Sequence, residues 1–363
     1  MNYKHDAPDR LGILLVNLGS PDEPTTPAVR RYLAEFLWDP RLVDIPRPLW
    51  WLILHGVILR IRPARSAEAY RQVWTEKGSP LIDISRRQTQ GVTQQLASTL
   101  SDEFAIELAM RYGNPSIPDA LEALKKAGMQ RLLVLPLYPQ FSSTTTASVF
   151  DAIAKAMQRW RWIPELRYIT HYHDHPLYIE ALANSIRQHW QENPPAEKLL
   201  FSFHGIPKRY FDEGDPYYCH CQKTARLVAE KLELADNRWQ VVFQSRFGRE
   251  EWLKPYCDET LKALPGQGVK SVDLVCPGFS ADCLETLEEI DEENREYFLH
   301  AGGEQFSYIP ALNDNEDHIK ALCDVIIGHL KGWPEGNTEF DPQQRAAELK
   351  DSLERAQKMG AKT

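Results

Sequence analysis

The sequence predicts an α/β fold made of two similar Rossmann-like domains, each with a parallel sheet, and an active-site cleft between them. Three observations lead to this prediction. Short apolar runs alternate with amphipathic segments of helical length, the pattern of βα units. Part of this pattern occurs twice along the chain. Polar side chains follow several of the apolar runs, at the strand ends where parallel sheets bind their ligands.

The apolar runs are predicted to be buried strands, because their residues are apolar on both faces. The first, "LGILLVNLGSP" (residues 11–21), ends in a Gly-Ser-Pro turn. The later runs are "FAIELAMRYG", "RLLVLPLYP", "LLFSFHG", "WQVVFQS" and "SVDLVCPG". Segments such as "SIPDALEALKKAGM" and "YIEALANSIRQHW" lie between them and show the spacing of amphipathic helices.

An internal repeat divides the chain. The series Pro139, Phe141 and Ser142 returns as Pro277, Phe279 and Ser280, each after a helix, a Gly turn and an apolar run. "LLVNLGSP" similarly corresponds to "LLFSFHGIP". We therefore expect an N-terminal domain over residues 1–160, a C-terminal domain over 161–330 and a polar tail over 331–363. Chance similarity between short apolar motifs is the alternative.

The repeat is informative where its two copies differ. Leu18 in the first half corresponds to His204 in the second, and "FSSTTTASVFDAI" corresponds to the acidic "FSADCLETLEEI". The reactive side chains are therefore predicted to lie in the second half, on loops after strand ends.

Composition and charge exclude several classes of protein. The 363 residues carry a net charge of −9, which disfavours nucleic acid as a partner. The N-terminus has no apolar core of a signal peptide, and no run reaches the roughly 18 apolar residues of a membrane span. We expect a cytoplasmic protein whose six cysteines are reduced and mostly buried.

His204 is the first candidate for chemistry. It follows an apolar strand and precedes Gly205, which places it at a crevice edge where neutral imidazole can accept a proton or bind a metal. The alternative is a histidine that is hydrogen-bonded to the backbone and has no function.

The acidic segment that follows Cys276 is the second candidate. It holds seven carboxylates between Glu285 and Glu296, of which Glu285, Glu289 and Glu293 recur every fourth residue. Like charges at this helical spacing repel one another, so either the face is simply solvated or the series handles protons and cations. Asp282-x-x-Glu285 also fits a helix capping box. One His with one carboxylate is too few for a tightly held zinc, which favours a metal that is bound transiently.

Weaker candidates complete the set. Arg62, Tyr70, Ser79, Arg111 and Tyr112 would suit an aromatic ligand that carries carboxylates, although each alone also fits an ordinary surface residue. Cys219 and Cys221 lack a matching second pair, so a metal cluster on them is not expected. Nucleotide-binding Gly-x-Gly-x-x-Gly and phosphate loops are absent.

The segment "IPRPLWWLILHGVILRIRPARS" (residues 45–66) is apolar with a basic rim. It fits either a buried helix or an exposed lip that meets a membrane surface or a flat apolar ligand.

The sequence resembles the ferrochelatase family, which inserts ferrous iron into protoporphyrin IX in the last step of haem synthesis. The resemblance runs from residue 11 to residue 330. It rests on "LLVNLGSP", "YRQVWTEKGSPL", "MRYGNP", "LPLYPQFSSTTTAS", "SFHGIP", "FQSRFGREEWLKPY" and "CPGFSADCLETLEEI", the last three like those of proteobacterial members. It implies two chelatase-type domains with the porphyrin between them.

The resemblance also implies roles for individual residues. His204 matches the His of the family's S-x-H motif and Glu285 the Glu of its E-T-L motif; these two bind iron or accept the pyrrole protons, and Glu289 and Glu293 continue the path. The implied neighbours of the porphyrin are Leu18, Arg62, Tyr70, Ser79, Arg111, Tyr112 and Phe279. Trp50 and Trp51 match the lip at the pocket mouth, which can touch a membrane.

Further expectations concern cofactors and partners. Animal members hold a [2Fe–2S] cluster through cysteines of a C-terminal extension, but residues 331–363 contain none. No cofactor is therefore expected to be required, Fe²⁺ is the substrate, and a cluster on Cys219 and Cys221 is a minor alternative. The porphyrin could be handed over by the preceding oxidase of the haem pathway, with the protein peripheral on the inner face of the membrane.

Two other functions fit part of the sequence. A haem or porphyrin carrier would use the same apolar cleft but would not need the glutamate series. A chelatase for cobalt or for a sirohaem precursor would be expected to carry more basic residues and less tryptophan in the lip.

Overall fold

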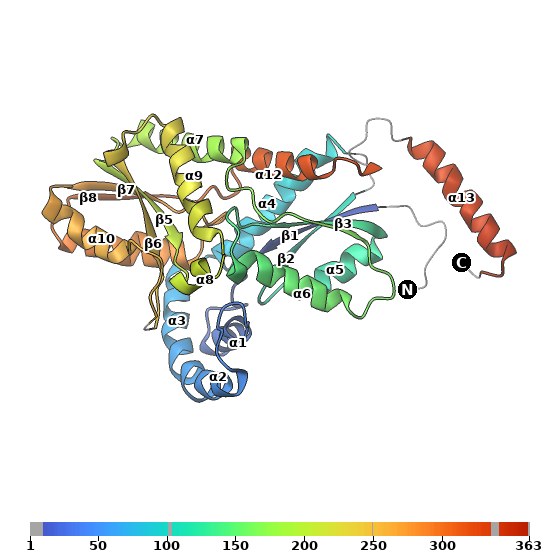
Figure 1. Cartoon of the computed structure of the whole chain (residues 1–363), viewed down its shortest axis with the longest axis horizontal. Helices are drawn as coiled ribbons and strands as arrows, with labels where there is room; N and C mark the ends of the chain where they lie inside the picture. The colour runs from blue at the N-terminus through green and yellow to red at the C-terminus, as the bar shows by residue number, and fades with distance from the viewer. Residues whose placement is uncertain (1–9, 101–103, 249, 335–340, 362–363) are drawn as a thin grey trace.

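Two four-stranded parallel sheets organise the protein in the computed structural model, which describes residues 10–100, 104–248, 250–334 and 341–361 (Figure 1). The first has the order β2-β1-β3-β4 and the second the order β6-β5-β7-β8. The strands are β1 (Arg10–Asn17), β2 (Phe104–Met110), β3 (Met129–Pro136), β4 (Glu165–Tyr168), β5 (Lys198–His204), β6 (Trp239–Gln244), β7 (Ser271–Val275) and β8 (Gln305–Ile309). The equal strand order agrees with the predicted similarity of the halves.

The strands are buried because apolar residues cover both of their faces. In β1, Leu11, Ile13 and Leu15 face one core, whereas Leu14 and Val16 face another. The six apolar runs recognised in the sequence form β1, β2, β3, β5, β6 and β7. The two strands that sequence analysis missed, β4 and β8, are short and lie at sheet edges.

Helices cover both faces of each sheet. On the first sheet α5 (Ile117–Lys126) and α6 (Ser148–Met157) enclose one core, while α4 (Pro80–Ala97) lies over the opposite face. On the second sheet the corresponding layers contain α10 (Cys257–Ala263) with α11 (Arg295–His300), and α9 (Tyr217–Lys231). Short elements join them: η2 (Ser143–Ala147), α8 (Lys208–Asp212), η3 (Asp236–Arg238), η4 (Leu264–Gln267) and η5 (Glu285–Asn294).

The two halves exchange a helix. Helix α7 (Pro176–Glu192) follows β4 of the first sheet but packs against α9 and β8 of the second half. Helix α12 (Glu316–His329) follows β8 of the second sheet but packs against α4 and β3 of the first half. The two helices also pack on each other across the middle of the molecule (Figure 1). One continuous apolar core consequently runs through both halves.

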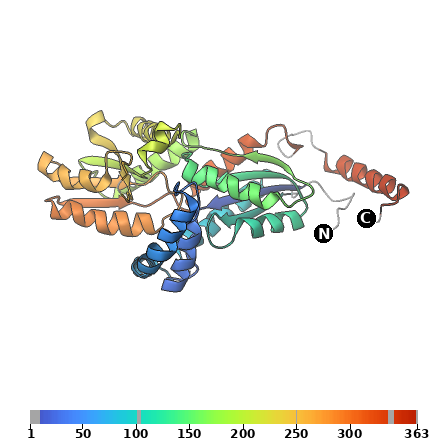
Figure 2. The ribbon, with the colours of Figure 1, turned by 60° about the horizontal axis from the view of Figure 1, so that its bottom comes forward.

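The segment 45–66 projects from the first half together with the preceding helix, as Figure 2 shows in blue. It forms α2 (Arg47–Ile53), η1 (Leu54–Ile58) and the start of α3 (Leu59–Val73), which packs on α1 (Thr26–Leu37). Several of its large apolar side chains are exposed: Leu49, Trp51, Leu52, Val57 and Ile61. The segment is therefore an exposed lip and not an ordinary buried helix.

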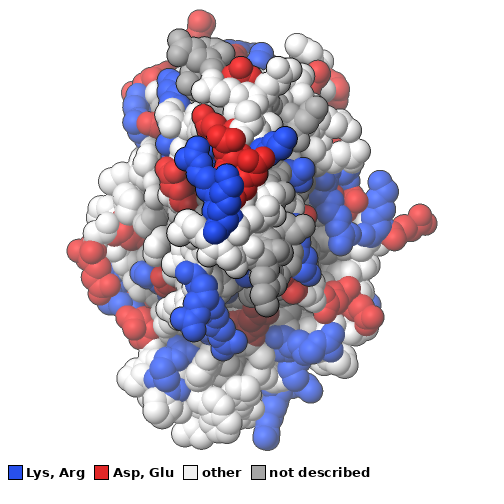
Figure 3. Space-filling model, turned by 90° about the vertical axis from the view of Figure 1, so that its right-hand side faces the viewer, with Lys and Arg blue, Asp and Glu red and all other residues white. Residues whose placement is uncertain are grey.

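The tail contains α13 (Pro342–Lys358), which extends away from the body. The face of the molecule at this end mixes acidic and basic side chains (Figure 3). No helix in the described ranges is long and apolar enough to cross a membrane.

Candidate active site

His204 ends β5, and its position is set by the strand and by the turn that follows. Its ring Nδ1 lies 2.7 Å from the Gly205 carbonyl oxygen. Because a carbonyl can only accept, Nδ1 carries the proton in the neutral ring, and Nε2 presents its lone pair. The alternative interpretation, a histidine that only bonds to the backbone, therefore accounts for Nδ1 but not for Nε2.

The surroundings of His204 favour its neutral form. Burial lowers the pKa of His204, while the hydrogen bond to Gly205 and the negative charge of Glu285 act in the opposite direction. The Trp252 ring lies 6.5 Å from the imidazole ring, centroid to centroid. An imidazole that is neutral at physiological pH can accept a proton or bind a metal ion.

The acidic segment is helical, as its spacing predicts, and its turns are wider than those of an α-helix. Residues Glu285–Asn294 form a π-helix, the type of helix whose characteristic hydrogen bond joins residues five apart. Side-chain amides bond to two of its carbonyls: Gln244 donates to Glu285 at 3.0 Å and Asn294 to Glu289 at 2.7 Å. Single π-turns are frequent at functional sites, and this helix is longer than one turn.

The predicted capping box does not form between Asp282 and Glu285. The Asp282 carboxylate accepts hydrogen bonds from Thr286, Tyr308 and Asn313. Thr286 in turn accepts from the backbone N–H of Cys283 at 3.0 Å. In the described residues, no backbone N–H of this helix start is shown donating to the Glu285 side chain, so that carboxylate is not used as a helix cap.

The glutamate series is graded from the interior to the surface. Glu285 and Glu289 are half-buried, whereas Glu293 is exposed. Burial, with a smaller contribution from the Glu285 charge, raises the pKa of Glu289 to about 7, although Ser245 and Gln244 donate hydrogen bonds to it. Glu293 accepts from the Tyr297 hydroxyl at 2.5 Å. A carboxyl with a pKa near 7 can both take up and release protons at physiological pH.

Apolar residues of both halves meet beside this series. Leu18, after β1, and Phe279, after β7, pack on a buried cluster of Leu81, Ile84, Ala281 and Cys283. Tyr70 of α3 is also buried, and burial followed by the Glu285 charge raises the pKa of its phenol. Ser79 is buried at the start of α4. Leu18, Tyr70, Phe279 and Glu285 thus come together although they are far apart in the sequence.

Arg111 and Tyr112 make a different set of contacts. Arg111 donates to Asp39 at 2.5 Å and to the Ser148 hydroxyl at 2.7 Å, while the buried Tyr112 hydroxyl donates to Asp39 at 2.8 Å. These side chains form an internal polar cluster. Arg62 lies on the exposed side of α3.

The sequence analysis missed Gln244, Ser245 and Trp252. Gln244 and Ser245 belong to "FQSRFG" and Trp252 to "REEWLKPY", both of which carried the family resemblance, but no residue pattern marked them individually. Ser245 has a left-handed backbone conformation with φ of 65°, which could not be predicted from the sequence around it.

All six cysteines fall in the described residues and are free thiols; only Cys219 is exposed, and burial raises the pKa of Cys221 well above its ordinary value. Within the described ranges no group of three or more His, Cys, Asp or Glu side chains is arranged to hold a metal ion.

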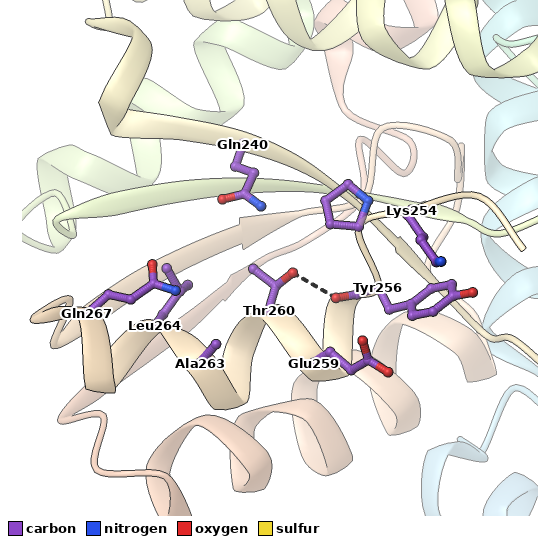
Figure 4. A pocket seen from close by; sticks show the side chains of 9 residues that line it. Gln240, Lys254, Tyr256, Glu259, Thr260, Ala263, Leu264 and Gln267 are labelled. Atoms are coloured by element: carbon purple, nitrogen blue, oxygen red, sulfur yellow. Dashed lines mark hydrogen bonds between the residues drawn. The ribbon is translucent and has the colours of Figure 1, made fainter.

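A surface hollow of about 550 Å³ lies between β6 and α10, lined by Lys254, Tyr256 and Glu259 among others (Figure 4). None of the candidate residues lines it.

The two similar parallel sheets, with His204 at the end of β5 and Glu285 at the start of the π-helix that follows β7, form a chelatase-type α/β fold. The solved structure "SirB from Bacillus subtilis with Fe3+" is similar in fold, with a TM-score of 0.52 at 14% identity over 92% of this chain and 100% of that one. A cobalt complex of a sirohydrochlorin chelatase from Bacillus subtilis subspecies spizizenii gives a TM-score of 0.51 at 13% identity, with the same coverage.

Sequence comparison identifies the family. The pattern of the family described as Ferrochelatase matches residues 10–330. Relatives named Ferrochelatase are 60% identical in Marinobacter nauticus, over 95% of this chain and 94% of the relative, and 55% identical in Thioalkalivibrio sulfidiphilus, over 99% and 98%. The chain belongs to the ferrochelatase family. It is a lyase that inserts Fe²⁺ into protoporphyrin IX, giving protohaem and two protons in the last step of haem synthesis.

Proposed function

We propose that iron insertion takes place between His204 and Glu285, with the porphyrin held between the two halves. The observation that carries this proposal is that Glu285 lies near enough to His204 for its negative charge to raise the pKa of the imidazole. Nδ1 of that ring is bonded to Gly205, so Nε2 presents the lone pair. Further carboxylates continue from Glu285 to the surface. The alternative of a carrier without chemistry gives no role to this series.

In the proposed reaction, two pyrrole N–H protons leave the ring as one Fe²⁺ enters it, so that charge balances. His204 accepts a proton at Nε2, because Nδ1 is already bonded to Gly205. Glu285 and Glu289 take protons towards Glu293 and solvent, or guide the cation inward, since carboxylate oxygens suit a hard divalent ion. The metal is substrate, and we propose no resident cofactor; a cluster on Cys219 and Cys221 stays the minor alternative.

The proposed porphyrin neighbours fall into two groups. Leu18, Tyr70, Phe279 and Ser79 lie around the apolar cluster and would contact the macrocycle. Arg62 is exposed and able to reach a propionate, whereas Arg111 and Tyr112 would contribute from the internal cluster with Asp39. Burial of the flat apolar ring would offset the strain of bending it, and bending exposes the nitrogen lone pairs.

We also propose where the protein works. The lip at residues 45–66 would rest on the inner face of a membrane, with the body in the cytoplasm and the porphyrin received from the preceding oxidase. Its exposed Leu49, Trp51 and Leu52, with basic residues nearby, are the features of an interfacial segment.

The two-domain division is likewise proposed. We propose domains over residues 1–160 and 161–330 and a polar tail over 331–363; strand β4 pairs with β3, so the first sheet continues past residue 160.

An anaerobic assay tests the function. When purified protein is mixed with protoporphyrin IX and Fe²⁺, the porphyrin fluorescence should fall as iron is inserted. His204→Ala should abolish this turnover while porphyrin binding stays measurable. Full activity of His204→Ala would refute its role. Stoichiometric binding without turnover by the unchanged protein would favour the carrier, and turnover with another tetrapyrrole alone would replace the substrate.

A further inference from the structure

Gln244 lies between the strand that carries His204 and the helix that carries Glu285. It is the last residue of β6, where it pairs with His204 across the parallel ladder, and its exposed fraction is 3%. It is neither a proton acceptor nor a metal ligand in the proposed reaction. It nevertheless contacts both the strand that carries His204 and the π-helix that carries Glu285 and Glu289.

The backbone of Gln244 is tied to the turn that orients His204. The Gly205 N–H donates to the Gln244 carbonyl at 2.8 Å, and the Gly205 carbonyl accepts from His204 Nδ1 at 2.7 Å. A Cβ on residue 205 would lie 2.9 Å from the Gln244 oxygen and 3.1 Å from Trp252. Only glycine permits this close approach, so the position of Gln244 fixes the carbonyl that holds the imidazole ring.

The side-chain amide of Gln244 uses both of its ends. Nε2 donates to the Glu285 carbonyl at 3.0 Å and to the Glu289 carboxylate at 3.5 Å. Oε1 accepts from the Ser202 hydroxyl at 2.8 Å and from the Cys276 thiol at 3.6 Å. The Glu285 carbonyl can only accept, so the NH₂ group must face the helix and the amide cannot turn over.

We propose that Gln244 is a positioning residue for metal insertion, which holds the first turn of the π-helix at a fixed place relative to His204. Through it, the carboxylates of Glu285 and Glu289 keep their places with respect to the imidazole. This inference rests on the roles proposed above for His204 and Glu285.

Gln244→Met keeps the length of the side chain but removes the donor and the acceptor. Since hydrogen bonds to charged or buried groups are lost, kcat should fall by about tenfold to a hundredfold, while the KM for porphyrin changes by less than about threefold. The acidic limb of the pH–rate profile should also move to higher pH, because the amide that favours ionised Glu289 is gone. A purely structural residue would not move this limb.

Gln244→Glu is the second variant and decides the matter if the methionine variant does not fold. It keeps the shape of the side chain and the bond from Ser202, but as a carboxylate it cannot donate to the helix. The acidic limb of its pH–rate profile should also move to higher pH, because the added negative charge opposes ionisation of Glu289.

Gln140→Met is the matched control. Gln140 is also buried, with an exposed fraction of 2%, and donates to Thr224 at 3.0 Å away from the π-helix. This variant should lower the melting temperature but leave the pH limb in place. The positioning role is overturned if the Gln244 variants keep the wild-type kcat and limb, or if Gln140→Met shifts the limb equally. Failure of the unchanged protein to insert iron would instead refute the proposed function.

Discussion

Trp50 and Trp51 are adjacent in the sequence but lie in opposite environments on α2. Trp50 is buried, and its indole N–H donates to the Leu37 carbonyl at 2.7 Å, so it anchors the lip to the end of α1. Trp51 has an exposed fraction of 51% and stacks loosely on His55. Only the second tryptophan belongs to the exposed apolar surface of the lip.

The first prediction concerns this surface. Trp51→Ser combined with Leu52→Ser should reduce sedimentation with vesicles that contain anionic lipid by at least about tenfold, because two inserted apolar side chains are lost. Trp162 and Ile163 are similarly exposed on the connection between α6 and β4 and serve as the control pair. Equal loss of binding in Trp162→Ser with Ile163→Ser would contradict a specific role of the lip.

The second prediction concerns the pH dependence of turnover. With a pKa of about 7, Glu289 is ionised and able to accept a proton only as the pH rises through that value, so activity should rise over the same range. Glu289→Gln should lower kcat by about tenfold to a hundredfold and remove this limb. Glu230→Gln, an exposed change on α9, should leave the profile as it is. An unchanged limb in Glu289→Gln would remove Glu289 from the proton path.

The third prediction concerns stability at the same residue. The folded protein holds the Glu289 proton up to about pH 7, whereas in the unfolded chain the group ionises near its ordinary value of 4.5. The folded state therefore binds more protons between these values, and its stability falls as the pH rises from about 4.5 to 7. Glu289→Gln should lessen this fall, by an amount on the order of 1 kcal/mol for a half-buried group. Urea unfolding at pH 4.5 and 8 measures it; equal differences from wild type at both pH values would contradict the raised pKa.

The fourth prediction concerns the internal cluster of Asp39. Asp39→Ala leaves the Arg111 guanidinium without its ionic partner inside the protein and should lower the free energy of unfolding by about 3–5 kcal/mol. The exposed pair of Arg41 and Asp151 offers a comparison, since Asp151→Ala should cost less than about 1 kcal/mol. Arg111→Met added to Asp39→Ala should recover part of the loss. Additive losses in the double variant would argue against coupling of the two charges.

Much of the fold could be predicted because it depends on burial, which sequence patterns report directly. Strands that are covered on both faces need continuous apolar runs, and β1, β3 and β5 have them. Strand β4, with the sequence ELRY, has only partly buried or exposed residues and gives no such signal. The exchange of α7 and α12 depends on packing between distant segments, which local patterns do not contain.

The site could be predicted in part. The position of His204 after an apolar strand and the density of carboxylates after Cys276 marked the residues of the proposed site. The π-helical form did not follow, because the spacing of Glu285, Glu289 and Glu293 fits α and π turns alike, and the amides that bond to its carbonyls come partly from another strand. The internal contacts of Arg111 could not be foreseen either, since Asp39 is remote in the sequence.

The exchanged helices also determine the order in which parts of the chain can pack during its translation. Ile319 of α12 packs directly over Gly91 of α4, where a Cβ would lie 3.1 Å from it. During translation the first sheet and α4 are complete long before α12 has left the ribosome, so the apolar surface that α12 covers stays open until nearly the whole chain has been synthesised. We therefore expect the N-terminal half to complete its packing only when α12 docks, and a nascent chain stalled before residue 316 to be sensitive to proteases and to bind chaperones.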